Sequence, residues 1–495
     1  MLFNSLEFIF IFCPIVVGIF YALSHFRLYD LAIAFLCLAS LFFYSYWRPE
    51  YLILLLCSIA FNYLIGRAIQ ASQPGGDRAR WLMIFGIVLN LAALAYYKYA
   101  GFAVKTANGI LSVDAPVPEI VLPLAISFYS FTQIAYLVDA YRGDAGDYNP
   151  VVYTLFISFF PQLIAGPILR HDQLIPELEN KQIFTFSQRS FATGIAIFLL
   201  GLAKKILIAD TISPWVGGIF SNAGELNFVE AWFGALAYTF QLYFDFSGYS
   251  DMAVGLGRMF NVHIPLNFNS PYKATSIADF WRRWHITLSN FLRDYLYIPL
   301  GGNRKGKIRQ YINLVVTMLL GGLWHGAGWT FVLWGGLHGI YLALHRIWSQ
   351  LSISIPAEVS RLLTFACVVI SWVLFRSQSL PEAMSMLSTM AGAKGIVIPA
   401  KLSILESLDF LNILTVESGN ISEVFARLPG GSNAWTLLNC SLLVCVGLAA
   451  RFSPNTQEIV EKFEMNWYWG ACLGVLASIA FLSLSRPSEF LYFQF

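Results

Sequence analysis

Charged residues are scarce in this sequence. Only 12% of its 495 residues are charged, whereas a soluble globular domain carries about 25%. Hydrophobic residues make up 57% of the chain and aromatic residues 16%, so polar side chains are too few to cover a water-facing surface of this size. The composition argues against a soluble enzyme or a disordered chain, and it predicts a multi-pass protein embedded in the lipid bilayer.

Nucleic-acid-binding proteins and disulfide-rich proteins are also disfavoured, by the low net charge and by the positions of the cysteines. The formal net charge is only +2, which is too small for a protein that binds nucleic acid. The seven cysteines lie in apolar runs without a CxxC pair, so we expect buried apolar side chains rather than disulfides. The first lysine or arginine is Arg27, so we expect the first span to be retained rather than cleaved as a signal peptide.

Apolar runs long enough to approach the bilayer thickness recur along the chain, because a crossing helix needs about 20 such residues. The candidate spans are 8–24, 30–47, 51–66, 82–100, 119–139, 151–169, 189–209, 230–248, 311–324, 328–345, 361–375, 435–450 and 467–485. Several are short or contain proline, so we expect broken or re-entrant segments among them and about ten true crossings. The predicted fold class is therefore an all-α, polytopic membrane protein.

Basic residues in the loops predict the orientation. Arg27 follows the first span and Arg67, Arg78 and Arg80 follow the third, so the N-terminus is expected outside the cytoplasm. The densest basic region is 273–309, which we also place in the cytoplasm. The basic residues of this region can serve only to keep the loop in the cytoplasm. Alternatively, some of them can bind an anionic ligand such as a cofactor with phosphates. The long stretch 376–434 contains an apolar patch that could lie at the membrane interface, formed by Leu402, Leu405, Leu408, Phe410 and Leu411.

A histidine lies on an apolar helix face in the stretch 276–298. Ser276 and Asp279 resemble a capping box, Pro299 marks an end, and apolar residues recur between them at helical spacing. These features predict one amphipathic helix with His285 on its apolar stripe. The ring can be a hydrogen-bonded structural group or part of a site.

A second histidine lies in a long uncharged run. No Asp, Glu, Lys or Arg occurs between Arg309 and Arg346, and His325 would lie about 24 Å along a helix that begins at Arg309. Flanking glycines, from Gly321 to Gly328, are expected to break the helix and admit a ligand or another backbone. An uncharged imidazole at such depth suits a general base that deprotonates a hydroxyl, or it is a packing histidine with a satisfied ring.

Two other arrangements of polar residues remain open. A zinc site made of His285, His325 and His338 lacks any short ligand spacing, so no metal is expected. The run 241–251 places Asp245, Asp251 and several hydroxyls beside an apolar span. These groups can line a cavity, pair with cations, or cap a broken helix that begins near Ser250.

Several ordered segments together resemble the membrane-bound O-acyltransferase family, and within it the subgroup of membrane subunits that serve bacterial alginate O-acetylation. They are FFPQLIAGPI (159–168), DFSGYSDMA (245–253), NFNSPY (267–272), FWRRWH (280–285), RDYLYIPLGGNR (293–304), LWHG (323–326) and the ending FLYFQF (490–495). The resemblance covers about residues 1–350 together with this ending.

The resemblance implies a catalytic histidine at His325 and a second active-site position at His285. It implies a core of residues 1–350 around a central funnel, with helices of 351–495 completing the shell. The acyl donor would be acetyl-CoA as a substrate, with no permanently bound cofactor. Further substrate or donor contacts are expected from Asp245, Ser247, Tyr249, Asn269, Arg282, Arg304 and Trp324.

The implied task is transfer of an acetyl group across the inner membrane of a bacterium, for O-acetylation of a cell-surface polysaccharide such as alginate. An exported O-acetyltransferase partner would complete it. A multi-pass transporter and a non-catalytic scaffold of a polysaccharide-secretion complex are the rival functions. Within the enzyme class, acetylation of cellulose or peptidoglycan and D-alanyl transfer to teichoic acid also remain open.

Overall fold

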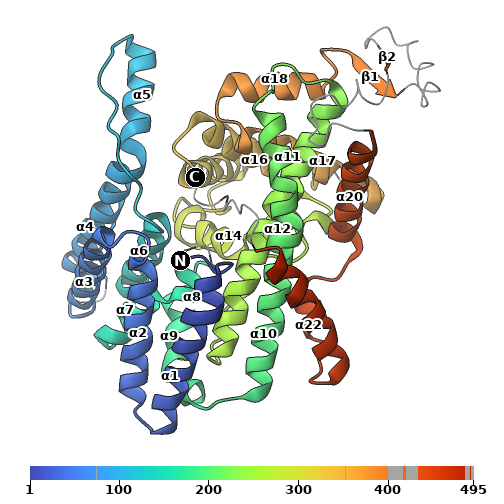
Figure 1. Ribbon diagram of the computed structural model, residues 1–495. Helices are drawn as coiled ribbons and strands as arrows, with labels where there is room; N and C mark the ends of the chain where they lie inside the picture. Colours follow the sequence, from blue (N-terminus) through green and yellow to red (C-terminus); the bar gives the residue numbers. More distant parts are fainter. Residues whose placement is uncertain are drawn as a thin grey trace.

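The chain folds almost entirely into helices (Figure 1). The computed structural model describes residues 1–495 except 74, 165, 352, 400–415, 420–432, 485–490 and 492–495. The expected all-α class is confirmed, and the described residues also include two short parallel strands, β1 (Ile396–Pro399) and β2 (Val416–Gly419). The apolar patch predicted between 402 and 411 lies outside the described residues, as does most of the ending 490–495.

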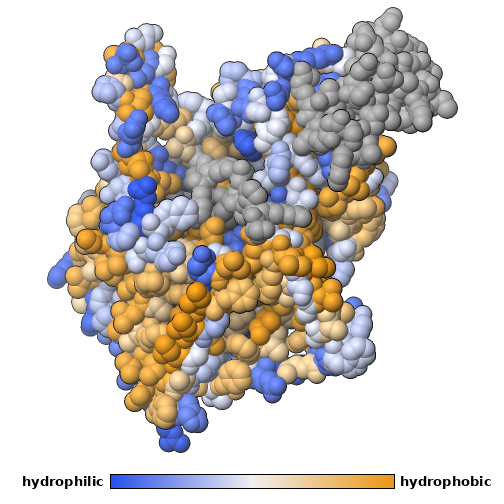
Figure 2. Space-filling view, viewed as in Figure 1, coloured by the Kyte–Doolittle hydropathy of each residue, from blue (hydrophilic) through white to orange (hydrophobic). Residues whose placement is uncertain are grey.

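Five helical stretches of the described chain are long and apolar enough to cross a membrane. They are Phe8–His25, Glu50–Gln70, Asp77–Leu111, Gln188–Phe220 and Ala357–Arg376. Shorter apolar helices cover Tyr29–Ser45, Leu437–Phe452 and Trp467–Leu482. Hydrophobic side chains form a broad band over the lower part of the surface, with hydrophilic residues above and below it (Figure 2), which is the pattern that a bilayer requires.

The N-terminal quarter contains a helix far longer than the predicted span 82–100. A π-helical turn joins α4 to α5, and together they run over Asp77–Leu111, 35 residues. The elements of this part are η1 (Phe8–Phe12), α1 (Cys13–His25), α2 (Tyr29–Ser45), α3 (Glu50–Gln70), α4 (Asp77–Leu94), η2 (Ala95–Tyr99), α5 (Ala100–Leu111) and α6 (Ile126–Arg142). The predicted span 119–139 is helical only from Ile126, after a loop that contains Pro123.

The second part contains a close crossing of α10 and α12. Its elements are α7 (Pro150–Ser158), α8 (Phe160–Leu163), α9 (His171–Glu179), η3 (Lys181–Phe184), α10 (Gln188–Ala203), η4 (Lys204–Ala209), α11 (Asp210–Phe220) and α12 (Phe228–Met259). A Cβ atom on Gly201 of α10 would lie 2.5 Å from the backbone oxygen of Gly248 of α12. Only glycine permits so close an approach, and small residues of this kind commonly hold membrane helices together. The candidate span 151–169, which contains Pro161 and Pro167, is broken into the short helices α7 and α8, as expected of spans that contain proline.

The third part differs from the sequence prediction at one point that matters for the site. Its elements are η5 (Pro271–Lys273), α13 (Ile277–Arg283), α14 (Ile286–Leu292), η6 (Arg293–Tyr297), α15 (Lys307–His325) and α16 (Trp329–Trp348). The single helix expected over 276–298 is wrong, because the chain turns between α13 and α14, where His285 has a left-handed backbone with φ 43°.

The C-terminal part packs against α10, α12 and α16. It contains α17 (Ala357–Arg376), α18 (Leu380–Met390), the two strands, α20 (Asn433–Phe452), α21 (Thr456–Val460) and α22 (Trp467–Leu482). Trp372 and Phe375 of α17 are buried against the site described below. Residues beyond 350 therefore contribute directly to the surroundings of His325.

Candidate active site

The helical hairpin α15–α16 positions His325, the last residue of α15. Gly326 and Gly328 have extended backbones, which separate the two helices. The helices touch closely below the turn, because a Cβ atom on Gly322 would lie 2.3 Å from the backbone oxygen of Phe331. The break predicted from the flanking glycines is confirmed, and it leaves the His325 side chain at a helix end inside the protein.

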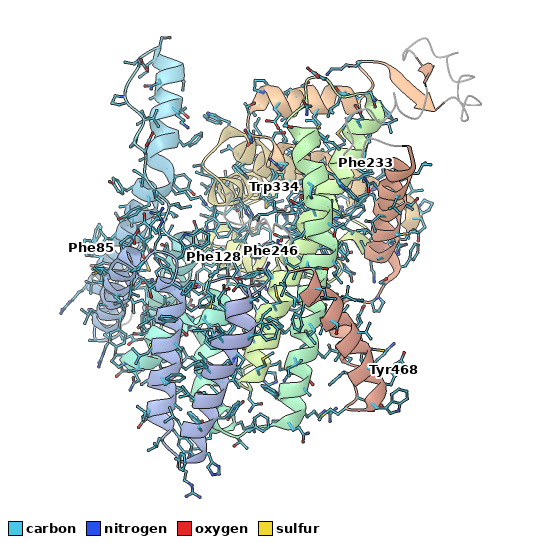
Figure 3. All side chains as sticks on the ribbon, viewed as in Figure 1. Phe85, Phe128, Phe233, Phe246, Trp334 and Tyr468 are labelled. Carbon is cyan, nitrogen blue, oxygen red and sulfur yellow. The ribbon has the colours of Figure 1, made fainter. Side chains whose placement is uncertain are left out.

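Aromatic side chains surround the His325 ring. Its centroid lies 4.9 Å from that of Trp324, 5.1 Å from that of Trp334 and 5.3 Å from that of Phe375. His325 is 8% exposed, and the labelled Phe128, Phe246 and Trp334 mark this central region (Figure 3). The surroundings are buried and mostly aromatic, which favours an uncharged ring.

His285 lies beside His325, with ring centroids 6.4 Å apart. Its Nδ1 is 3.1 Å from Oδ1 of Asn267, which also accepts the backbone N–H of Thr287. An amide oxygen only accepts, so Nδ1 carries the proton and Nε2 carries a lone pair. Nε2 is buried and has no hydrogen-bond partner among the described residues, which leaves it available to a substrate group.

The third histidine of the region, His338, accepts a hydrogen bond from a tryptophan. Nδ1 of His338 accepts a hydrogen bond of 3.3 Å from Nε1 of Trp281, and its ring centroid lies 5.0 Å from that of Trp334. Within the described chain, no group of three or more His, Cys, Asp or Glu side chains is placed to hold a metal ion. His338 therefore supports the aromatic wall around His325.

Two cavities reach His325 from different directions. One has a volume of about 110 Å³ and is lined by Lys98, Ser127, Phe128, Trp324, His325 and the segment 122–126, among others. The other, about 20 Å³, is lined by Leu242, Asp245, Phe246, Trp284, His325, Trp372, Phe375 and Leu491. The first offers polar groups to a ligand, whereas the second is a narrow, mostly apolar space.

A larger, cation-lined cavity opens between the first half of α15 and the end of α16. Its volume is about 580 Å³, and Arg282, Arg293, Arg346 and His345 are among its lining residues. The hydrogen bond from Arg293 to Asp294 raises the pKa of that guanidinium, so its charge is permanent. The cavity extends to Thr317 and Met318, about 11 Å along α15 from His325.

The carboxylates of the run 241–251 are paired with cations. The helix α12 continues unbroken through Ser250, which excludes one alternative left open by the sequence, a broken helix that begins there. Asp245 and Asp210 lie 2.7 Å and 2.6 Å from Nζ of Lys205. Asp251 lies 2.7 Å from Nζ of Lys204. Of the alternatives left open by the sequence, ion pairing describes this run, although Asp245 also borders the 20 Å³ cavity.

The other predicted contacts fall into two groups. Trp324 and Asp245 line cavities at His325, and Arg282 lines the large cavity. Tyr249 stacks on Phe3 at 4.5 Å, and Asn269 accepts a hydrogen bond from Asn455. Ser247 is buried in α12 and Arg304 is exposed in a turn, and neither lines the cavities described above.

Sequence reasoning missed Lys98. Its Nζ lies 2.5 Å from the backbone oxygen of Trp324, 3.1 Å from that of His325 and 3.4 Å from Oγ of Ser127. The signal was present in the sequence, because Lys98 is the only charged residue between Arg80 and Lys105. A lone cation inside an apolar span is a candidate functional residue.

The arrangement suits acyl transfer within the membrane: an uncharged imidazole in an apolar pocket, a second imidazole with a lone pair beside it, and a separate cavity lined by arginines. Residues 19–379 match the membrane-bound O-acyltransferase family (MBOAT). The chain therefore belongs to this family of membrane-embedded O-acyltransferases, which is an enzyme family, as the resemblance implied.

The chain is also similar to individual named proteins. The chain is 39% identical to the peptidoglycan O-acetyltransferase of Helicobacter pylori, over 100% of this chain and 98% of the relative. It is 44% identical to the probable alginate O-acetylase AlgI of Pseudomonas aeruginosa, over 79% of this chain and 75% of the relative. A more distant relative is the teichoic acid D-alanyltransferase of Bacillus subtilis, at 27% identity over 48% of this chain and 62% of the relative.

Proposed function

We propose that this protein transfers an acetyl group from acetyl-CoA, bound on the cytoplasmic side, toward an extracytoplasmic polysaccharide. The observation that carries the proposal is the position of His325, which is buried among aromatic rings yet borders cavities. A base in a nearly dry site can accept a proton from an alcohol without competing water.

The donor would enter through the 580 Å³ cavity. Its arginines face the volume in which the phosphates of coenzyme A would lie, and guanidinium groups bind phosphate oxygens through paired, charge-assisted hydrogen bonds. Arg282 and Arg346 come from different elements, α13 and α16, yet line the same cavity. The pantetheine arm is an extended chain, which suits the remaining distance from Met318 to His325.

The chemistry needs only side chains of this chain. The acceptor oxygen attacks the thioester carbonyl, the carbon–sulfur bond breaks, and coenzyme A leaves as a thiol. His325 takes the proton from the attacking hydroxyl and returns it to the departing sulfur, so the base is regenerated. His285, through the lone pair on Nε2, would orient the acceptor hydroxyl beside His325. The 20 Å³ apolar space next to His325 has room for about one water-sized group, so it would receive no more than the methyl end of an acetyl group.

Two acceptors are supported by different observations. The relative that matches the chain from end to end is a peptidoglycan O-acetyltransferase, whereas the alginate O-acetylase has the higher identity over a smaller share. Both names describe O-acetylation of a polysaccharide outside the cytoplasm. We therefore propose a glycan hydroxyl as the final acceptor, reached through an exported O-acetyltransferase partner.

We also propose an orientation of the protein in the membrane. Loops rich in arginine, including 71–80 and 273–309, would lie in the cytoplasm of a bacterium, with the N-terminus outside. Residues 1–350 would form the core with the catalytic funnel, and the helices of 351–495 would complete the shell.

A labelled donor tests the enzymatic part. The purified protein is incubated with radiolabelled acetyl-CoA, an extracytoplasmic glycan fraction and a periplasmic extract that supplies the exported partner, and release of the thiol and labelling of the glycan are measured. An acyltransferase releases thiol in step with glycan labelling, whereas a transporter or a scaffold leaves the thioester intact. Acetate analysis of alginate-like polymer and of peptidoglycan from cells with and without the protein identifies the acceptor.

A further inference from the structure

The C-terminal end of α15 is capped by side chains from another helix. A helix leaves its last four backbone oxygens without partners inside the helix. In α15, the oxygen of Gly322 accepts the N–H of Gly326 at 3.4 Å. The oxygen of Leu323 accepts the hydroxyl of Tyr99 at 2.9 Å. Lys98 donates to the oxygens of both Trp324 and His325, so all four are accounted for.

The neighbours Lys98 and Tyr99 can both reach α15 because of a local change in their own helix. They lie in the π-helical turn η2, between α4 and α5. A π-helical turn within an α-helix inserts an extra residue, changes which side chains share a face, and is frequent at functional sites. Successive residues of an α-helix normally point about 100° apart, yet here both donate to consecutive carbonyls of one helix end.

The ammonium group of Lys98 also matches the charge of the structure it touches. The C-terminal end of a helix carries about half a negative charge, which a cation stabilises. Nζ of Lys98 lies 5.9 Å from the centre of the Trp324 ring, within cation–π range. In the part of the chain that the structure describes, no carboxylate forms an ion pair with Lys98, so its charge is offset by carbonyl dipoles and the ring.

We propose that Lys98 and Tyr99 form a clamp that positions the catalytic base. The clamp holds the backbone of Trp324 and His325, and thereby fixes the His325 ring relative to the donor and acceptor. This inference rests on the proposed function, in which His325 is the base. Lys98 and Tyr99 are positioning residues, because they act through the backbone of His325.

Loss of the clamp leaves carbonyl oxygens without partners in an apolar environment. The end of α15 then moves to find other donors, and His325 moves with it. A displacement of about 1 Å at a reacting group can lower the rate about 100-fold. The donor cavity is lined by other residues, from α13, α15, α16 and the segment 289–303 among others, so affinity for acetyl-CoA is retained.

The test compares Lys98→Met, Lys98→Arg and Tyr99→Phe in the full-length purified protein. Thiol release is measured over a range of acetyl-CoA concentrations, to separate kcat from KM. Lys98→Met is expected to lower kcat about 100-fold with KM within about two-fold of wild type. Lys98→Arg keeps the charge and donors, and it recovers at least a tenth of the wild-type kcat. Tyr99→Phe removes one hydrogen bond and lowers kcat about three- to ten-fold.

Lys105 supplies the matched control, because it is exposed on the same long helix. Lys105→Met should leave kcat and KM unchanged. The clamp is overturned if Lys98→Met retains the wild-type kcat, or if Lys98→Met and Lys98→Arg lose kcat equally. Should Lys98→Met fail to accumulate in the membrane, Tyr99→Phe decides, since an unchanged kcat in that variant contradicts the clamp.

The outcome also separates this inference from the proposed function. If wild-type protein releases no thiol from acetyl-CoA, the proposed function fails. Hydrogen exchange of the amides around 322–328 then still tests the clamp, because Lys98→Met should speed exchange there without changing α16 beyond Gly335. If wild-type protein is active and the variants match it, only the clamp fails.

Discussion

Two lysines with similar local settings have opposite surroundings. Lys98 and Lys205 both lie in π-helical turns, η2 and η4, inside long apolar helices. Lys205 is fully buried between the carboxylates of Asp210 and Asp245. Among the described residues, Lys98 is hydrogen-bonded to two backbone oxygens and a hydroxyl and lies over the Trp324 ring, at a helix end beside His325. Lys205, which is held by carboxylates, therefore joins helices. Lys98, which is held by backbone carbonyl groups, would instead support the site around His325.

The largest loss of stability is expected from a substitution of Lys205. Lys205→Met leaves two carboxylates buried without their cation, which costs about 3–5 kcal/mol. We expect the protein to disappear from the membrane fraction, as measured by immunoblotting. Substituting Asp210→Asn and Asp245→Asn in the same chain should restore its abundance. Wild-type abundance of the single variant would mean that Lys205 is no structural cation.

The arginines of the large cavity differ from both Lys98 and Lys205, because they line a volume that a ligand can occupy. The double variant Arg282→Gln, Arg346→Gln should raise KM for acetyl-CoA about tenfold and leave kcat unchanged, since only donor binding is weakened. The measurement is the same thiol-release assay. Arg189→Gln, an exposed arginine at the start of α10, is the control and should behave as wild type. A fall in kcat at unchanged KM would remove this cavity from the donor path.

Lys204 should show a smaller loss of stability than its neighbour Lys205. Its side chain is 19% exposed, and its partner Asp251 also accepts a hydrogen bond of 2.5 Å from Thr456. Lys204→Met therefore leaves Asp251 partly satisfied and should cost about 1 kcal/mol. Thermal unfolding in detergent measures the difference. A loss as large as that of Lys205→Met would show that exposure does not separate the two pairs.

The smallest effect is expected at Arg304. It is exposed and does not line the large cavity, although the sequence made it a candidate donor contact. Arg304→Gln should change kcat and KM by less than about two-fold, as surface substitutions generally do. An increase in KM comparable to that of the Arg282, Arg346 double variant would extend the donor site to the turn 300–305.

The sequence was most informative around His325. A charge-free run with one central histidine and adjacent glycines predicted a break at that residue, and α15 ends there. The apolar runs also predicted the helical class, because a helix that crosses the bilayer needs about 20 apolar residues. Both signals are local and strong, so they need no knowledge of which helices become neighbours.

The sequence was least informative where tertiary contacts override local pattern. The apolar spacing over 276–298 fits one helix, yet the contacts of His285 with Asn267 accompany a left-handed residue and a turn. The run 241–251 allows a broken helix that begins near Ser250, yet α12 continues to Met259, and its Gly248 and Gly255 lie against α10. The contacts of Lys98 with the end of α15 join residues more than 220 positions apart, and no local pattern encodes them.

The role of His325 is tested most directly by the acetate content of the envelope glycan in cells that carry His325→Ala. Membrane abundance of the variant is matched to wild type by immunoblotting. The prediction is a fall to the level of cells without the protein, because removal of a general base lowers a rate about 10²–10⁴-fold. Wild-type acetate content at equal abundance would contradict the account.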